Sequence, residues 1–226
     1  MTWPAGATIS IVSNDDVAYD IMIPVSAVAA SDIQSCAQCG FSWATLTRAE
    51  FATRMSAAIE SFVDVMATAG AAVDLRTSAE RWSILEYGGH LRDVILSIRE
   101  RIVLASILEV PVGTPIFRDE RIDIGFYGQD TASDVSVELQ VTTFLFLKTV
   151  ATLPANYENR RLVYSTNTPL EITISGAMSN ALHECEHHLS DAKEILELID
   201  ASRRRAQIRD APTASARPTA FPTSPT

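Results

Sequence analysis

The sequence predicts an all-α protein whose body is a four-helix bundle, flanked by an irregular N-terminal arm and a disordered C-terminal tail. Three observations predict this fold. Four segments between residues 47 and 199 repeat apolar residues at spacings of three and four, the period of an amphipathic helix. Capping residues, glycine or proline mark the ends of these segments. The flanking stretches show no such period.

The first two helices begin at capping boxes. Thr47-Arg48-Ala49-Glu50 places a hydroxyl before a helix and a glutamate three residues later, and Gly70 ends that helix. Ser83-Ile84-Leu85-Glu86 repeats the pattern, and the second helix runs to about Leu108, just before Pro111. The apolar stripe of the first helix is Phe51, Met55, Ile59, Phe62, Val63 and Met66.

The other two helices are predicted from their apolar spacing. The third starts near Ser133 or Asp134 and stops at Pro154, and the fourth runs from about Ser175 to Ile199. The apolar stripe of the third is Val137, Val141, Phe144, Leu145 and Leu147. The apolar spine of the fourth is Met178, Leu182, Cys185, Leu189, Ala192, Leu196 and Ile199.

Long connections and both flanks complete the predicted organisation. The connections 109–132 and 154–172 are long for a bundle, so we expect short strands or 3₁₀ turns in them and one rim of a pocket. The domain boundaries are an arm at 1–44, the bundle at 45–200 and a tail at 201–226. In the arm, extended pieces are expected near Thr8–Val12 and Tyr19–Val25. Residues from about 202 onwards are rich in Ala, Pro, Thr, Ser and Arg, and they predict disorder.

Composition and charge narrow the class of protein. The net charge is −10, yet residues 201–226 hold five arginines and one acid, so the acidic excess lies in the body. Such a body should repel nucleic acid and anionic membranes. The three cysteines are too few for a disulfide scaffold and predict a reducing cytoplasm. The apolar stretch Ile21–Ala30 resembles a signal peptide, but the first basic residue is Arg48, which argues against secretion.

The four histidines are concentrated in two places and predict a metal site. His90 lies in the second helix, and His183, His187 and His188 lie in the fourth. His183 and His187 are four residues apart, so their rings project from one face of a helix. Two such imidazoles and a third from another helix can bind one divalent cation. We therefore expect His90, His183 and His187 to be the metal ligands, and His188 to be a surface or satisfied core group.

The same segment contains the HExxH pattern of zinc metallopeptidases, with Glu184 as the base. The further ligands that those enzymes need are not evident, because Ser190 and Lys193 occupy the downstream Gly and His positions of one class. Another class needs a glutamate from a later helix, and little chain remains for one. A peptidase is therefore the least favoured alternative.

Two segments resemble the DinB-like superfamily, which includes mycothiol-dependent maleylpyruvate isomerases and bacillithiol transferases. They are Trp82–Val94, with Tyr87-Gly88-Gly89-His90-Leu91-Arg92-Asp93, and His183–Leu189. The resemblance covers about residues 45–200 and implies a four-helix bundle with a divalent metal, often zinc or nickel, at one end of the core. The matching positions are His90, His183 and His187. In the maleylpyruvate isomerase branch a glutamate replaces the first histidine of the last helix, and Glu184 with His188 would copy that spacing. We favour His183 and His187, which we expect beside the apolar spine.

The resemblance implies that the metal activates a low-molecular-weight thiol such as mycothiol. Three protein ligands leave an open coordination position, which is typical of a catalytic site. A metal also lowers the pKa of a thiol, and the thiolate can attack an electrophilic carbon. Glu184 and Glu186 are candidates to orient the imidazoles, and Arg92 to receive a substrate carboxylate. Each also has a plainer role, in solvent or in an ion pair.

The pair Cys36-Ala37-Gln38-Cys39 is half of a zinc knuckle. No second CxxC follows it, so Cys185, His188 or a second subunit would have to complete four ligands. A redox pair is the alternative. Cys185 falls on the apolar spine and is expected to be a small core residue.

Three functions remain open on these grounds. The first is a cytoplasmic metal- and thiol-dependent transferase or isomerase that acts on a small electrophilic substrate. The second is a non-catalytic metal-binding or stress-response bundle, and the third is the zinc metallopeptidase. The expected partners are a small-molecule substrate and a thiol, with neither nucleic acid nor membrane, and an exposed bundle face could pair two subunits into a homodimer.

Overall fold

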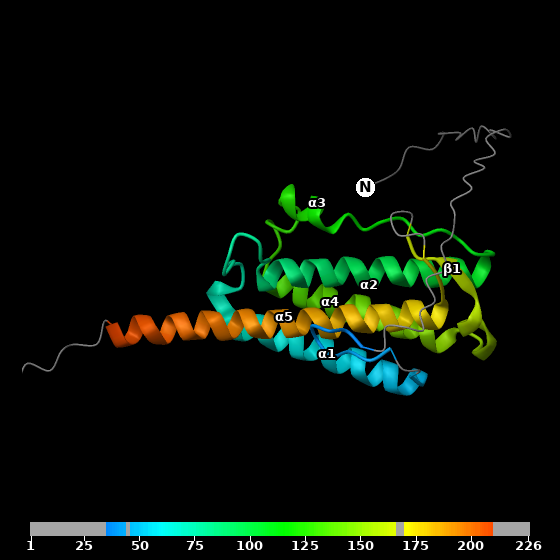
Figure 1. The fold of residues 1–226 in the computed structure, drawn as a ribbon, viewed down its shortest axis with the longest axis horizontal. Helices are drawn as coiled ribbons and strands as arrows, with labels where there is room; N and C mark the ends of the chain where they lie inside the picture. The colour runs from blue at the N-terminus through cyan, green and yellow to red at the C-terminus, as the bar shows by residue number, and fades with distance from the viewer. Residues whose placement is uncertain (1–34, 44–45, 166–169, 210–226) are drawn as a thin grey trace, which may run out of the picture.

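The computed structural model describes residues 35–43, 46–165 and 170–209. Four long helices form its body and lie side by side (Figure 1): α1 (Arg48–Ala69), α2 (Ile84–Ile107), α4 (Ala132–Thr152) and α5 (Ile174–Arg209). α1 and α2 each pack mainly against α4 and α5, which places consecutive helices α1 and α2 at diagonal corners. The predicted all-α four-helix bundle is confirmed.

Both predicted capping boxes are present, and they explain where α1 and α2 begin. The Thr47 hydroxyl accepts a hydrogen bond from the Glu50 amide, and the Glu50 carboxylate accepts one from the Thr47 amide. Ser83 and Glu86 repeat this exchange at the start of α2. These contacts satisfy amide groups that have no partner inside the first helical turn. α1 ends at Gly70, which has a φ of 57°.

The predicted apolar stripe of α4 is wrong, because most of it faces solvent. Val137, Val141 and Phe144 are exposed, whereas the core receives Val135, Leu139, Phe146 and Val150. Apolar residues surround α4 on nearly every side, so their spacing alone does not select a face. The buried face also contains Thr142, whose hydroxyl donates to the Glu138 carbonyl and so avoids an unpaired polar group.

The C-terminal limit of the bundle also differs from the prediction. Residues 202–209, expected to be disordered, continue α5 as a helix to Arg209, and this end extends past the other helices (Figure 1). One cause is Arg203, which donates to the Ala69 carbonyl at 2.8 Å and so pairs an orphan carbonyl at the end of α1. The expected extended pieces at 8–12 and 19–25, and residues 210–226, lie outside the described residues.

The connections contain short elements, as expected. They are η1 (Gly70–Ala72), α3 (Arg118–Asp123), η2 (Ala155–Asn159), β1 (Arg161–Val163) and β2 (Glu171–Thr173). β1 and β2 pair antiparallel with Leu162 opposite Ile172, and β2 leads directly into α5. Val112, before α3, bridges to Val163 of β1, so the two long connections are tied together. Among the described helices, none is long and apolar enough to cross a bilayer.

Paired glycines in α2 make room for neighbouring side chains. A methyl group at Gly88 would lie 2.8 Å from Val135 Cγ1, and one at Gly89 would lie 2.6 Å from Tyr127 Cδ1. Tyr127 is almost completely buried over this point, and its hydroxyl donates to Asp93. The two glycines therefore allow Val135 of α4 and Tyr127, which precedes α4, to approach α2 closely.

Gly89→Ala should destabilise the fold by about 1–3 kcal/mol, because overpacking against Tyr127 outweighs the gain in helix propensity. The measurement is the free energy of unfolding in urea. Gly176→Ala in α5 is the matched control, since its methyl group would meet Ile172 at an ordinary 3.4 Å. Equal stability of Gly89→Ala and the native protein would contradict this packing.

Candidate metal centres

The histidines fall into two clusters of side chains that could bind a metal, and each cluster includes two residues of α5. In the first, His90 of α2 meets Glu184 and His188, and one ligand atom from each lies within 4.8 Å of the others. The Glu184 Oε2 atom is 3.6 Å from His90 Nε2 and 3.3 Å from His188 Nε2. His90 is only 2% exposed, and among the described residues neither of its ring nitrogens has a hydrogen-bond partner.

The protonation states of His90 and Glu184 in this first cluster suit a divalent cation. Burial lowers the pKa of His90, which leaves a neutral imidazole with a free lone pair. Burial favours the neutral form of Glu184, but the imidazoles of His188 and His90 outweigh it and hold its pKa well below the ordinary value. A neutral buried imidazole, a carboxylate and a second imidazole form a suitable donor set, and the unpaired His90 nitrogens would gain a partner.

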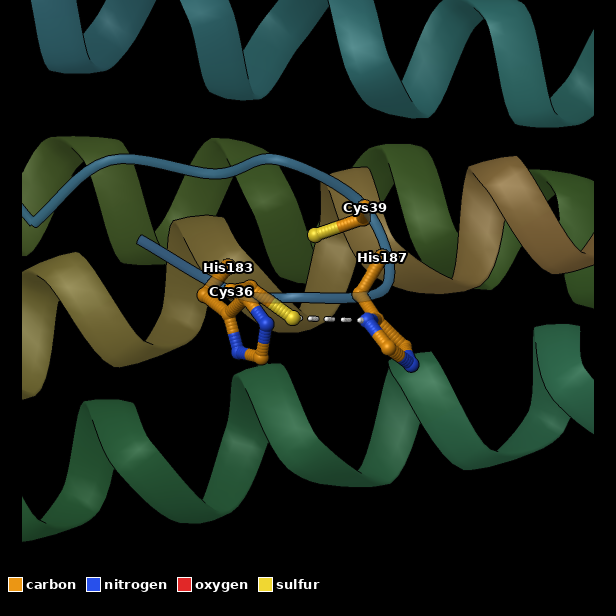
Figure 2. Close-up of side chains that lie close together, drawn as sticks. All are labelled: Cys36, Cys39, His183 and His187. Atoms are coloured by element: carbon orange, nitrogen blue, oxygen red, sulfur yellow. Dashed lines mark hydrogen bonds between the residues drawn. The ribbon is translucent and has the colours of Figure 1, made fainter. Parts of the chain in front are cut away.

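The second cluster joins Cys36 and Cys39 to His183 and His187, again with ligand atoms within 4.8 Å of one another. Figure 2 shows the two cysteines reaching from the loop before α1 toward the two histidines of α5. Cys36 Sγ is 3.7 Å from His187 Nδ1. Backbone amides of Cys39 and Gln38 lower the pKa of the Cys36 thiol to about 7, whereas burial raises that of Cys39.

The expected ligand set of His90, His183 and His187 is therefore not brought into one cluster among the described residues. The reason is helical phase. A helix turns about 100° per residue, so residues 184 and 188 lie about 100° and 60° from the buried Cys185, on the side of α2. Residues 183 and 187 lie about 160° from it, on the outer side that the loop covers. The peptidase arrangement is not assembled either, because Glu184 belongs to the other cluster.

A single carboxylate lies between the two clusters. Asp191 Oδ2 accepts a hydrogen bond from His188 Nδ1 at 3.0 Å and lies 3.7 Å from His187 Nε2. The first contact fixes the orientation of the His188 ring, with Nε2 facing Glu184. Burial disfavours the imidazolium of His188, but Asp191 and Glu184 outweigh it and raise the His188 pKa. His187, His188 and Asp191 also come within 4.8 Å as a group, but both imidazoles belong to the first two clusters.

A pocket of about 480 Å³ opens beside the first cluster. His90 and Glu184 line it, and residues 115–120 with Tyr164 form its rim, as expected for the long connections. Arg101 also lines the pocket although it is only 5% exposed. Its Nη2 donates to the Thr114 carbonyl, but among the described residues nothing accepts from its Nε or Nη1. A buried guanidinium with free donors is a ready site for an anion.

Two residues expected to be catalytic have other partners. Arg92 donates to Asp93, Asp130 and Glu138, and it is not among the residues that line the pocket. Glu186 forms a bidentate salt bridge with Arg54 on α1, with N–O distances of 2.8 and 2.7 Å. These contacts hold loops and helices together. Glu184 keeps a place in the site, as a candidate ligand.

Sequence reasoning missed Arg101, and it gave Glu184 with His188 only as the less favoured pair of ligands. Arg101 follows His90 by eleven residues, about three helical turns, so the two side chains project from the same face of α2. That spacing was a usable signal. For His188 the signal was its distance of four residues from Glu184, which matches that of His183 from His187.

Asp191→Asn should weaken divalent metal binding at the first cluster about tenfold or more, because His188 loses the carboxylate that orients it. Isothermal titration of metal-stripped protein with Zn²⁺ measures this, in a Cys36→Ser/Cys39→Ser background that removes the two thiols of the second cluster. Glu194→Gln, about one turn beyond Asp191 and exposed, is the matched control. An unchanged dissociation constant in Asp191→Asn would show that this carboxylate does not support metal binding by His188.

Comparison with known proteins supports the fold. No protein-family model matches the sequence, and a search of curated proteins finds no match. Among solved structures the chain is similar to YfiT from Bacillus subtilis, a probable metal-dependent hydrolase with an unusual four-helix bundle topology. The TM-score is 0.59 at 17% sequence identity, over 71% of this chain and 90% of that chain. At this identity the likeness establishes the fold alone, a four-helix bundle.

Proposed function

We propose that the protein is a metal-dependent enzyme whose reaction centre is His90, Glu184 and His188. One observation carries this proposal: three ligand atoms converge from α2 and α5, and two of the three side chains line a pocket of about 480 Å³. Pockets of this size hold small molecules. Three protein ligands leave coordination positions open, which is typical of catalytic metal sites.

The reaction that we propose is thiol-dependent transfer or isomerisation of a small electrophilic substrate. A divalent metal held by the three residues would supply Lewis acidity to a thiol beside it. The protein's part is to hold the His90 imidazole in its neutral form by burial, to keep Glu184 ionised, and to orient His188 through Asp191. Sequence resemblance supports a mycothiol-like thiol. Zinc and nickel are the metals it suggests.

Arg101 gives this proposal a substrate class. Arg101 lines the same pocket as His90, and two of its donors have no partner among the described residues, so we propose that the substrate or thiol carries a carboxylate or a similar anion.

Hydrolysis is the alternative reaction, and the likeness to YfiT favours it. The same residues would then act on water in place of a thiol. A direct comparison separates the two. Metal-loaded protein is incubated with mycothiol and either a chlorodinitroarene or a maleamate, and in parallel with ester and amide probes lacking thiol. Metal-dependent consumption of thiol supports the transferase, thiol-dependent isomerisation of the maleamate without net loss of thiol supports the isomerase, and thiol-independent hydrolysis supports the alternative. Tight metal binding without turnover would instead support a non-catalytic bundle.

His90→Ala and Glu184→Gln should each lower the metal-dependent kcat/KM about a hundredfold or more, because each removes one of three ligands. The rate of thiol consumption measures this. Glu197→Gln, exposed on the same helix, should retain the native rate. Full activity in both His90→Ala and Glu184→Gln would refute the proposed centre.

Arg101→Met should raise KM for maleamate about tenfold or more, the worth of a charge-assisted hydrogen bond, and leave KM for its uncharged methyl ester nearly unchanged. Arg99→Met is the control on the same helix, since Arg99 donates to Thr149 and is not a pocket residue. Equal effects on the acid and the ester would assign Arg101 a purely structural role through Thr114.

A further inference from the structure

The loop before α1 has the shape of a metal-binding knuckle. The Gly40 amide donates to the Cys36 carbonyl at 2.9 Å, and the Cys36 amide donates to the Phe41 carbonyl at 2.8 Å. Gly40 has a φ of 73°, which a residue with a side chain rarely adopts. This tight turn brings both thiols of the CxxC pair to one side, facing α5 (Figure 2).

Several contacts hold this loop on the outer face of α5. Phe41 is buried in the core cluster, and its ring packs against that of His183 at 5.3 Å between centroids. Trp43 donates to Asn180, and Gln38 donates to Asp191. The loop and the helix therefore meet over a packed area, and the four donor atoms are part of that contact.

The donor chemistry in this contact fits one kind of ion. Two thiols and two imidazoles are the ligands of structural zinc sites, and four protein ligands fill a tetrahedral shell. Both cysteine thiols are free, and among the described residues the buried His183 Nε2 has no hydrogen-bond partner. An imidazole nitrogen that is enclosed and unpaired is costly unless something occupies its lone pair.

We propose that Cys36, Cys39, His183 and His187 form a second metal site, a structural Zn²⁺ site that fastens the loop before α1 to α5. It is separate from the proposed reaction centre, because its ligands use the neighbouring face of the helix and include two sulfurs. The filled shell leaves no position for a substrate. The ion would close a loop of chain between residues 39 and 183, which restricts the unfolded state.

Cobalt substitution tests this directly, since thiolate ligands give Co²⁺ a charge-transfer band in the near ultraviolet that nitrogen and oxygen ligands do not. Metal-stripped, reduced protein is titrated with Co²⁺. We expect the band in the native protein, its loss in Cys36→Ser/Cys39→Ser, and its retention in His90→Ala/His188→Ala. Cys185→Ala is the matched cysteine control and should keep the band, because Cys185 is buried in the core. Absence of the band in the native protein, or its loss in the Cys185 variant alone, would overturn the proposal.

A second measurement on the native chain removes any dependence on whether the double variant folds. Cys36 and Cys39 should react with a disulfide reagent at least about tenfold more slowly with Zn²⁺ than after its removal, because the metal binds the reactive thiolates. Equal rates with and without Zn²⁺ would count against the site. So would a reduced protein that takes up no Zn²⁺ and returns to a Cys36–Cys39 disulfide in air. Failure of the reaction centre alone would leave both results unchanged.

Discussion

The angular positions of residues 183, 184, 187 and 188 around the axis of α5 determine which neighbouring element each of these side chains faces. Two pairs with a spacing of four residues, 183 with 187 and 184 with 188, are offset by a single position. That offset rotates the second pair about 100° from the first. One pair therefore faces His90 on α2, and the other faces the cysteine loop. Both clusters depend on α5 remaining a regular helix, which its packing against α1 and α2 secures.

Local signals in the sequence were sufficient to predict most of the fold. The boxes at Thr47 and Ser83 set two helix starts correctly, because they act through bonds between near neighbours. The burial of α4 could not be predicted in the same way. Large apolar residues such as Phe144 also occupy the exposed side of that helix, so only its neighbours decide which face is covered. The helical extension through Arg203 likewise depends on a distant carbonyl on α1.

The type of candidate site could be predicted from the sequence, but the residues that form it could not. The sequence identifies His90 and the helix that carries the other ligands, yet it offers two pairs at equal spacing. Measured from Cys185, phase favours Glu184 and His188 for the core side. What phase does not reveal is that the loop at Cys36 returns to cover His183 and His187, since that contact joins residues about 150 positions apart in sequence.

Asp191 has a consequence for how the two clusters could respond to each other. One oxygen of this carboxylate faces an imidazole from each cluster, His188 at 3.0 Å and His187 at 3.7 Å. Its negative charge therefore acts on both clusters. An ion at one cluster that interacts with this charge changes the metal affinity of the other cluster. Thermodynamic linkage requires the effect to be the same in both directions. Two ions bound in this way would bind cooperatively, positively or negatively, although each cluster alone binds a single ion.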